Sequence, residues 1–161
     1  MRFHVPILTV LAAILFSGCG QNSNSNSAAA AAPAGPRVVE ITANDQMKFS
    51  VSRIDAKAGE TLTVVLTNTG TVPKEVMGHD WVLLKAGSDV AAFSNAAATA
   101  KDTNYMPASL QGEVIAQIGL LGPRKSDEVT FTVPSKPGEY PFLCTFPAHY
   151  LAGMKGVLAV Q

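Results

Sequence analysis

The chain has 161 residues, of which 47% are apolar, 12 are Lys or Arg and 12 are Asp or Glu. A length of this order is typical of a single domain that is long enough to bury one core. The formal net charge of zero excludes the strongly basic surface of nucleic-acid-binding proteins, and it argues against a partner attracted by overall charge.

Residues 1–18 have the pattern of a secretory signal peptide. Arg2 supplies the positive start, and residues 5–16 form an apolar stretch that is too short to span a bilayer. Two small residues then precede Cys19, which resembles a bacterial lipoprotein signal in which the cysteine is acylated. We therefore expect a protein anchored by lipid at Cys19 on the extracytoplasmic side of a bacterial membrane, the periplasmic side or the cell surface. Gly20, in place of an aspartate, favours the outer membrane over the inner.

Two alternatives remain for the cysteines at this stage. Ordinary signal cleavage would leave Cys19 as an incidental residue, and two cysteines in the chain would also allow one disulfide.

The segment that follows Cys19 is of low complexity, with alternating Asn and Ser, a run of alanines and then Pro-Ala-Gly-Pro. Such a composition cannot bury a core, so residues 19–36 are predicted to be a disordered tether and residues 37–161 the folded domain.

Beyond Pro36, short runs rich in β-branched residues are separated by Gly and Pro turns. This regular spacing predicts an all-β domain, a sandwich or barrel. Residues 88–111 do not fit the pattern; they predict an insertion with a short helix around residues 90–98, to which no chemistry is assigned. The expected strands are Arg37–Ala43, Met47–Val51, Thr61–Thr67, His79–Leu84, Val114–Ile118, Glu128–Val133, Glu139–Cys144 and Gly156–Val160.

After Cys19 the chain contains only two histidines, His79 and His149, and one cysteine, Cys144. Cys144 lies five residues before His149, and Met154 lies five residues after it. Two histidines, a cysteine and a weak axial methionine are the ligands of a type 1 (blue) copper site. Zinc also accepts two His and one Cys, but a structural zinc site has a fourth strong ligand and paired spacing, which are not found here. The sequence therefore predicts one copper ion that alternates between Cu(II) and Cu(I).

Two segments resemble the copper-binding segments of the azurins, Met77-Gly78-His79-Asp80-Trp81 and Cys144-Thr145-Phe146-Pro147, the latter with Met154-Lys155-Gly156 after it. The resemblance covers most of residues 38–161. It implies a Greek-key β-sandwich of the cupredoxin type with a single copper. It also implies that His79, Cys144 and His149 are the strong ligands, Met154 the axial ligand and the carbonyl of Gly78 a weak contact opposite.

The chain departs from the azurin pattern in four respects. The segment between His149 and Met154 is one residue longer, which is similar to auracyanin or rusticyanin. Ala148 replaces a glycine, Asp80 replaces an asparagine, and the azurin disulfide pair is absent.

Residues around the ligands have expected roles as well. Asp80 is expected to orient the loop through Thr145, and the Phe146 amide to donate a hydrogen bond to the sulfur. His149 is expected to be the route for electrons, within an apolar rim that suits brief docking through a small interface. The residues of this rim are Met77, Pro147, Ala148, Tyr150 and Leu151.

Together these features predict a monomeric electron carrier and no enzymatic activity. Its expected partners are redox proteins such as a c-type cytochrome, a terminal oxidase or a reductase. An extracytoplasmic carrier that delivers copper to an oxidase is the alternative, although it would be expected to have Met- or His-rich tracts. Copper enzymes with similar sites need further histidines for a catalytic copper, and those are missing.

Overall fold

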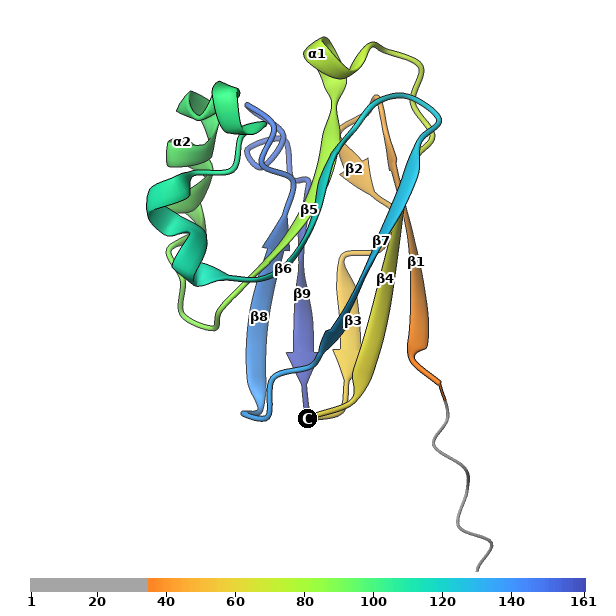
Figure 1. The fold of residues 1–161 in the computed structure, drawn as a ribbon, viewed down its shortest axis with the longest axis vertical. Coiled ribbons are helices and arrows are strands. Elements are labelled where there is room, and N and C mark those ends of the chain that lie inside the picture. The colour runs from red at the N-terminus through yellow and green to blue at the C-terminus, as the bar shows by residue number, and fades with distance from the viewer. Residues whose placement is uncertain (1–34) are drawn as a thin grey trace, which may run out of the picture. The chain divides into compact units, whose positions relative to one another are not determined.

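The computed structural model describes residues 35–161, so the predicted signal peptide, Cys19 and nearly all of the tether lie outside the described residues. The described chain forms nine strands in two sheets, with order β2-β1-β4-β7 and β3-β9-β8-β5-β6 (Figure 1). The strands are β1 Arg37–Asn44, β2 Lys48–Phe49, β3 Arg53–Ala56, β4 Thr61–Asn68, β5 His79–Leu84, β6 Val114–Leu121, β7 Ser126–Thr132, β8 Gly138–Leu143 and β9 Lys155–Val160.

The strands form because their apolar residues can be buried between the two sheets. In β4 the alternate residues Leu62, Val64 and Leu66 point to the same face of the sheet, and their side chains are fully buried. All six residues of β5 are buried, as expected of a strand inside a sheet. Trp81 packs against Phe142 with ring centroids 5.5 Å apart. The predicted all-β sandwich is confirmed.

The strand prediction missed β3, and the strand that it expected at residues 47–51 is longer than the observed β2. In β3 only Ile54 and Ala56 are apolar, and they alternate with Arg53 and Asp55, which leaves a weak signal. Pairing with β9, in parallel register from Arg53↔Val157 to Ala56↔Val160, makes this segment a strand. The partner strand therefore determines β3 more than its own side chains do.

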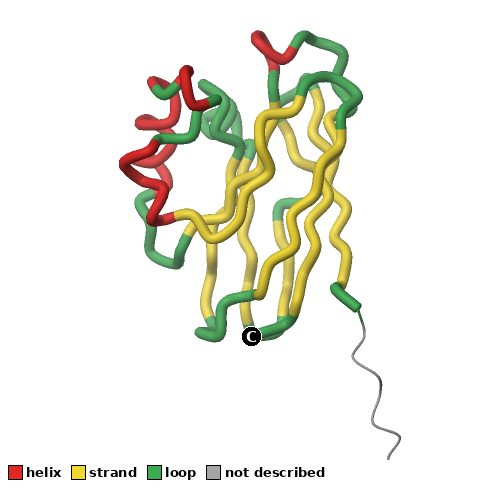
Figure 2. The backbone as a smooth tube through the Cα atoms, viewed as in Figure 1, coloured by secondary structure: helices red, strands yellow, loops and turns green. Residues whose placement is uncertain are grey.

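The insertion contains three short helices: α2 Val90–Thr99, η1 Lys101–Thr103 and η2 Ala108–Glu113. The side chain of Asp89 caps α2 by accepting a hydrogen bond from the Ala92 amide at 2.9 Å. Phe93 is fully buried and packs with Val82, Leu84 and Leu143 in a second apolar cluster. Figure 2 shows these helices gathered on one side of the sandwich, apart from α1 (Lys74–Met77).

The strand directions decide which segments meet at each end of the sandwich. Because β8 is antiparallel to both β5 and β9, the start of β5, the end of β8 and the start of β9 lie at one end. We call this the ligand end. The chain enters β1 and leaves β9 at the opposite end (Figure 1).

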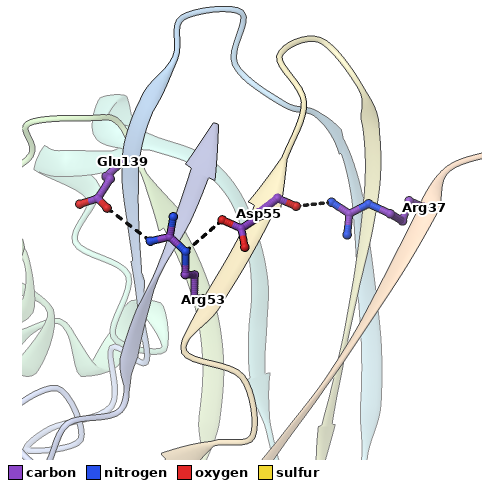
Figure 3. Close-up of polar contacts among 4 residues, drawn as sticks. All are labelled: Arg37, Arg53, Asp55 and Glu139. Carbon is purple, nitrogen blue, oxygen red and sulfur yellow. Dashed lines mark hydrogen bonds and ion pairs between the residues drawn. The ribbon is translucent and has the colours of Figure 1, made fainter. Parts of the chain in front are cut away.

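Away from the ligand end, a cluster of ion pairs includes one hydrogen bond between strands of the two sheets, from Arg37 of β1 to Asp55 of β3 (Figure 3). Arg53 contacts Asp55 at 2.9 Å and Glu139 at 3.5 Å, and Arg37 donates to the Asp55 carbonyl at 2.7 Å. Arg37 also pairs with Glu60 at 2.7 Å. Among residues 35–161, no helix is long and apolar enough to cross a bilayer.

Candidate metal centre

Three of the predicted donors meet at the ligand end. His79 is the first residue of β5, Cys144 directly follows β8, and His149 lies in the loop before β9. Their donor atoms all lie within 4.8 Å of one another, and all three residues are buried. Residues far apart in the sequence are therefore brought to one point by the pairing of β5 with β8.

The hydrogen bonding of these residues fits a metal ion. Both ring nitrogens of His79 are buried and have no hydrogen-bond partner among the described residues. The only polar neighbour found for the Nδ1 atom of His149 is the Cys144 sulfur, at 3.4 Å. Buried polar atoms normally have a partner, and two imidazoles beside a thiol suit copper. The donor set present therefore fits the copper ion expected from the sequence.

Backbone hydrogen bonds fold residues 144–154, the ligand loop, so that Met154 returns to Cys144. The Cys144 amide donates to the Met154 carbonyl at 3.1 Å, and the Met154 amide donates to the His149 carbonyl at 3.0 Å. The side chain of Met154 is fully buried. The longer loop thus still brings the backbone of the methionine to that of the cysteine and the second histidine.

Gly78 occupies a position without room for a side chain. A Cβ atom there would lie 2.7 Å from the Lys74 carbonyl oxygen and 2.8 Å from the Leu120 side chain. Because Gly78 both ends α1 and precedes His79, this close packing holds the backbone next to the first histidine.

Asp80 connects β5 to the start of the ligand loop. One carboxylate oxygen accepts a hydrogen bond from the Thr145 amide at 2.6 Å, and the other contacts the Thr145 hydroxyl. Burial raises the pKa of Asp80 to about 6, although these hydrogen bonds oppose the shift. The contact fixes the residue next to Cys144 relative to the strand that carries His79.

Burial also sets the protonation of the three donors. It raises the pKa of the Cys144 thiol, and the nearby charge of Asp80 adds to the shift. Burial, together with the charge of His79, lowers the pKa of His149 to about 4. Burial lowers the pKa of His79 as well, against the opposing charge of Asp45. Without metal, the site at neutral pH therefore holds two neutral imidazoles and a protonated thiol, which must lose its proton when a metal binds.

The predicted rim is exposed at some positions and covered at others. Ala148 is exposed and Leu151 is 79% exposed, whereas His149 itself is only 2% exposed. Tyr150 is half-buried: it packs against the second apolar cluster and has the Lys155 ammonium 4.4 Å from its ring centroid. Its ring is therefore less available to a partner than the sequence suggested.

Several contacts of the ligand loop could not be foreseen. The Lys48 ammonium of β2 donates to the Ala152 carbonyl, and the ring of Tyr105, from the insertion, packs on Phe146. Val76, 62% exposed on α1, adds a further apolar side chain next to Met77. No spacing pattern connects Lys48 or Tyr105 to the loop, because their proximity depends on the paths of other segments.

Comparison with known proteins agrees with this geometry. The family model of copper binding proteins, plastocyanin/azurin family, matches residues 37–161. The chain is 41% identical to azurin of Pseudomonas denitrificans and 40% identical to azurin of Pseudomonas aeruginosa, each over 126 residues. These alignments cover 76% of this chain, and 97% and 84% of the respective azurins.

Solved structures of auracyanins are also similar. Auracyanin from Roseiflexus castenholzii has a TM-score of 0.69 and 37% identity, with 80% of this chain and 99% of that chain covered. Auracyanin A from Chloroflexus aurantiacus has a TM-score of 0.69 and 34% identity, with 79% and 100% covered. The prediction of an azurin-like cupredoxin that uses copper is confirmed, and the chain belongs to the plastocyanin/azurin family of copper-binding proteins.

Proposed function

We propose that this protein is a type 1 copper electron carrier that is tethered outside the cytoplasm and is not an enzyme. His79, Cys144 and His149 would hold the copper as its strong ligands, and the Met154 thioether and the Gly78 carbonyl would be weak ones. The observation that supports this most directly is the buried cluster of two imidazoles and a thiol within 4.8 Å. Azurin and auracyanin relatives that match most of the chain support the same function.

Bound copper supplies the chemistry by alternating between Cu(II) and Cu(I). The protein holds the donors in one arrangement for both states. Asp80 fixes Thr145, and the backbone bonds of Cys144 and Met154 close the ligand loop. Because the ligands can move little, only a small free energy is needed to reorganise the site when an electron arrives or leaves.

The visible absorption spectrum of the Cu(II)-loaded protein tests this proposal, with Cys144→Ser as the comparison. An intense blue band from thiolate to copper that disappears on reduction is expected in the wild-type protein. The band should be missing in Cys144→Ser, since a hydroxyl replaces the thiolate. A colourless wild-type protein that still folds cooperatively would refute electron transfer and favour copper delivery or zinc binding.

We propose that partners dock over the apolar rim formed by Met77, Pro147, Ala148, Tyr150 and Leu151, and that electrons pass through His149. Leu151 and Val76 are two of the three large apolar side chains that the described residues expose, and both flank the ligands. Brief contact through a small apolar surface suits an electron carrier with a redox protein such as a cytochrome, an oxidase or a reductase.

The membrane anchor at Cys19 is a separate proposal that rests on the sequence of residues 1–20. In a bacterial host, Cys19→Ala should move the protein from the membrane fraction to the soluble extracytoplasmic fraction without changing its copper spectrum. A Cys19→Ala protein that stays in the membrane fraction would exclude lipidation as the anchor. Separating the inner membrane from the outer membrane in cells that make the wild-type protein would show which of the two carries it.

A further inference from the structure

Tyr105 reaches the ligand loop from the middle of the insertion. The helices of the insertion pack elsewhere: Phe93 of α2 belongs to the second apolar cluster, with Met106 and Leu110 beside it. Of the described insertion, residues 88–111, Tyr105 alone packs against the main core cluster, which contains Cys144, Phe146 and Met154. The insertion therefore makes a separate contact with the part of the core that holds the ligands.

The backbone at this point adopts an unfavourable conformation. Asn104 and Tyr105 have φ angles of 51° and 64°, two successive left-handed residues, and neither is glycine. The Asn104 amide donates to the Lys101 carbonyl at 3.0 Å, and the Tyr105 amide donates to the Ala100 carbonyl at 2.8 Å. An aromatic residue rarely adopts such an angle unless the surrounding structure imposes it, and such residues cluster at functional sites. The turn directs the ring of Tyr105 onto the ligand loop.

The ring of Tyr105 begins a stack of three rings. It meets Phe146 edge to face, with centroids 5.0 Å apart and an angle of 64° between the planes. Phe146 in turn lies over His149, with centroids 4.7 Å apart. Phe146 and His149 are both buried, whereas Tyr105 is half-buried and lines a pocket of about 180 Å³ with Lys74 and Lys101. Tyr105 thus separates Phe146 from a polar, solvent-facing pocket.

We propose that Tyr105 is a positioning residue of the copper site. Its ring holds Phe146 against His149 and keeps water from that side of the ligand loop. The proposal rests on the type 1 copper site described above, and it gives the insertion a role in setting the properties of that site. Exclusion of water and support of the ligands by neighbouring side chains control both metal retention and reduction potential.

Tyr105→Ala and Leu110→Ala in the full chain form a matched pair. Both remove a half-buried side chain from the insertion, but only Tyr105 contacts Phe146. Tyr105→Ala should lose copper to a chelator at least tenfold faster than the wild-type protein. Its reduction potential should fall, because water stabilises the more highly charged oxidised site. Leu110→Ala should lower the melting temperature but leave both copper properties unchanged.

Tyr105→Phe keeps the edge-to-face contact and should restore wild-type copper loss and potential. Should Tyr105→Ala fail to fold, Tyr105→Leu takes its place, because it keeps apolar volume but loses the ring. Equal effects of the Tyr105 and Leu110 variants, or no effect of Tyr105→Ala, would overturn the proposal.

A metal-free measurement separates this inference from the proposed function. In the metal-free protein, the ring N–H proton of His149, followed by NMR, should exchange with water faster in Tyr105→Ala than in the wild-type protein or in Leu110→Ala. Unchanged exchange would contradict the role of Tyr105 even in a blue protein. A wild-type protein that is not blue would refute the copper electron carrier, while the exchange comparison would still decide whether Tyr105 covers His149.

Discussion

Asp80 is a buried carboxylate that holds the start of the ligand loop through Thr145 while it lies beside the Cys144 thiol. Its charge is unfavourable in two ways: burial raises its own pKa to about 6, and its charge contributes to the raised pKa of the thiol. The residue therefore improves the geometry of the loop at an electrostatic cost. Asparagine at this position would keep the shape without the charge.

The stability of the metal-free protein should depend on pH through the two histidines of the site and, in the opposite sense, through Asp80. Between pH 6.5 and about 4, His149 binds a proton more readily in the unfolded chain, so stability falls as the pH falls. Between pH 6 and 3.8, Asp80 binds a proton more readily in the folded protein, so its contribution rises as the pH falls. The opposing contributions partly cancel in the wild-type protein.

Asp80→Asn removes the contribution of Asp80. The free energy of unfolding of the metal-free variant should therefore fall more steeply from pH 7 to pH 4.5 than that of the wild-type protein. Over this pH range, the loss of unfolding free energy in the variant should exceed that in the wild-type protein by at most about 3 kcal/mol. Urea unfolding at the two pH values measures it, and parallel pH profiles would show that Asp80 does not titrate as described.

Ala148 has a φ angle of 70°, in the left-handed region that favours glycine. Ala148→Gly should stabilise the folded protein by about 1 kcal/mol, because glycine has no Cβ to strain the turn. Thermal unfolding provides the measurement. Ala98→Gly, an exposed position within α2, should have the opposite sign, since glycine disfavours a helix by a similar amount. A lower melting temperature for Ala148→Gly would contradict the strain.

At the scale of the elements, the packing of β8 against β9 depends on a missing side chain. Gly156 of β9 pairs with Phe142 of β8. A Cβ atom at Gly156 would overlap the Phe142 ring and come within 2.5 Å of the Ser52 carbonyl oxygen. At this position of the strand that follows the ligand loop, any side chain would force Phe142 or the backbone to move.

Gly156→Ala should destabilise the protein by about 1–3 kcal/mol, because the added methyl group forces Phe142 or the backbone to move. Gly119→Ala in β6 is the matched control: nothing lies within 4 Å of its Cβ, so it should be neutral or slightly stabilising. Chemical denaturation of both variants gives the comparison. Equal stability of the two would mean that Phe142 has room to shift.

The sequence predicted the elements best where burial alone determines the strand. The expected strand His79–Leu84 coincides with β5, and the helix expected around residues 90–98 is α2. β3 was missed because its pairing with β9 determines it. The three donors of the metal centre were found because their residue types and spacing are specific to that chemistry. Tyr105 was not, because its contact depends on two left-handed residues whose conformation no local pattern predicts.

At the scale of the whole domain, apolar surface at the ligand end should govern electron exchange. Leu151→Lys places a charge on the rim, so two copies that meet through this end would repel each other. The electron self-exchange rate, measured by NMR line broadening in mixtures of reduced and oxidised protein, should fall about tenfold or more at low salt. The copper spectrum should stay the same.

Val38→Lys controls for the added charge. Val38 is 54% exposed and lies near the start of β1, at the opposite end of the sandwich. This variant should exchange electrons at the wild-type rate. Equal slowing in both variants would mean that net charge, and not the rim, sets the rate.

Both the start of β1 and the last residue of the described domain lie at the end away from the ligands, where the Ala58 amide donates a hydrogen bond of 3.0 Å to the Gln161 carbonyl. A linker, an electrode surface or a fused second protein joined at residue 35 or residue 161 would therefore meet the side where the ion pairs lie. The copper would face outward from any such support. The domain can thus be mounted at residue 35 or residue 161 and still present its ligand end to solution.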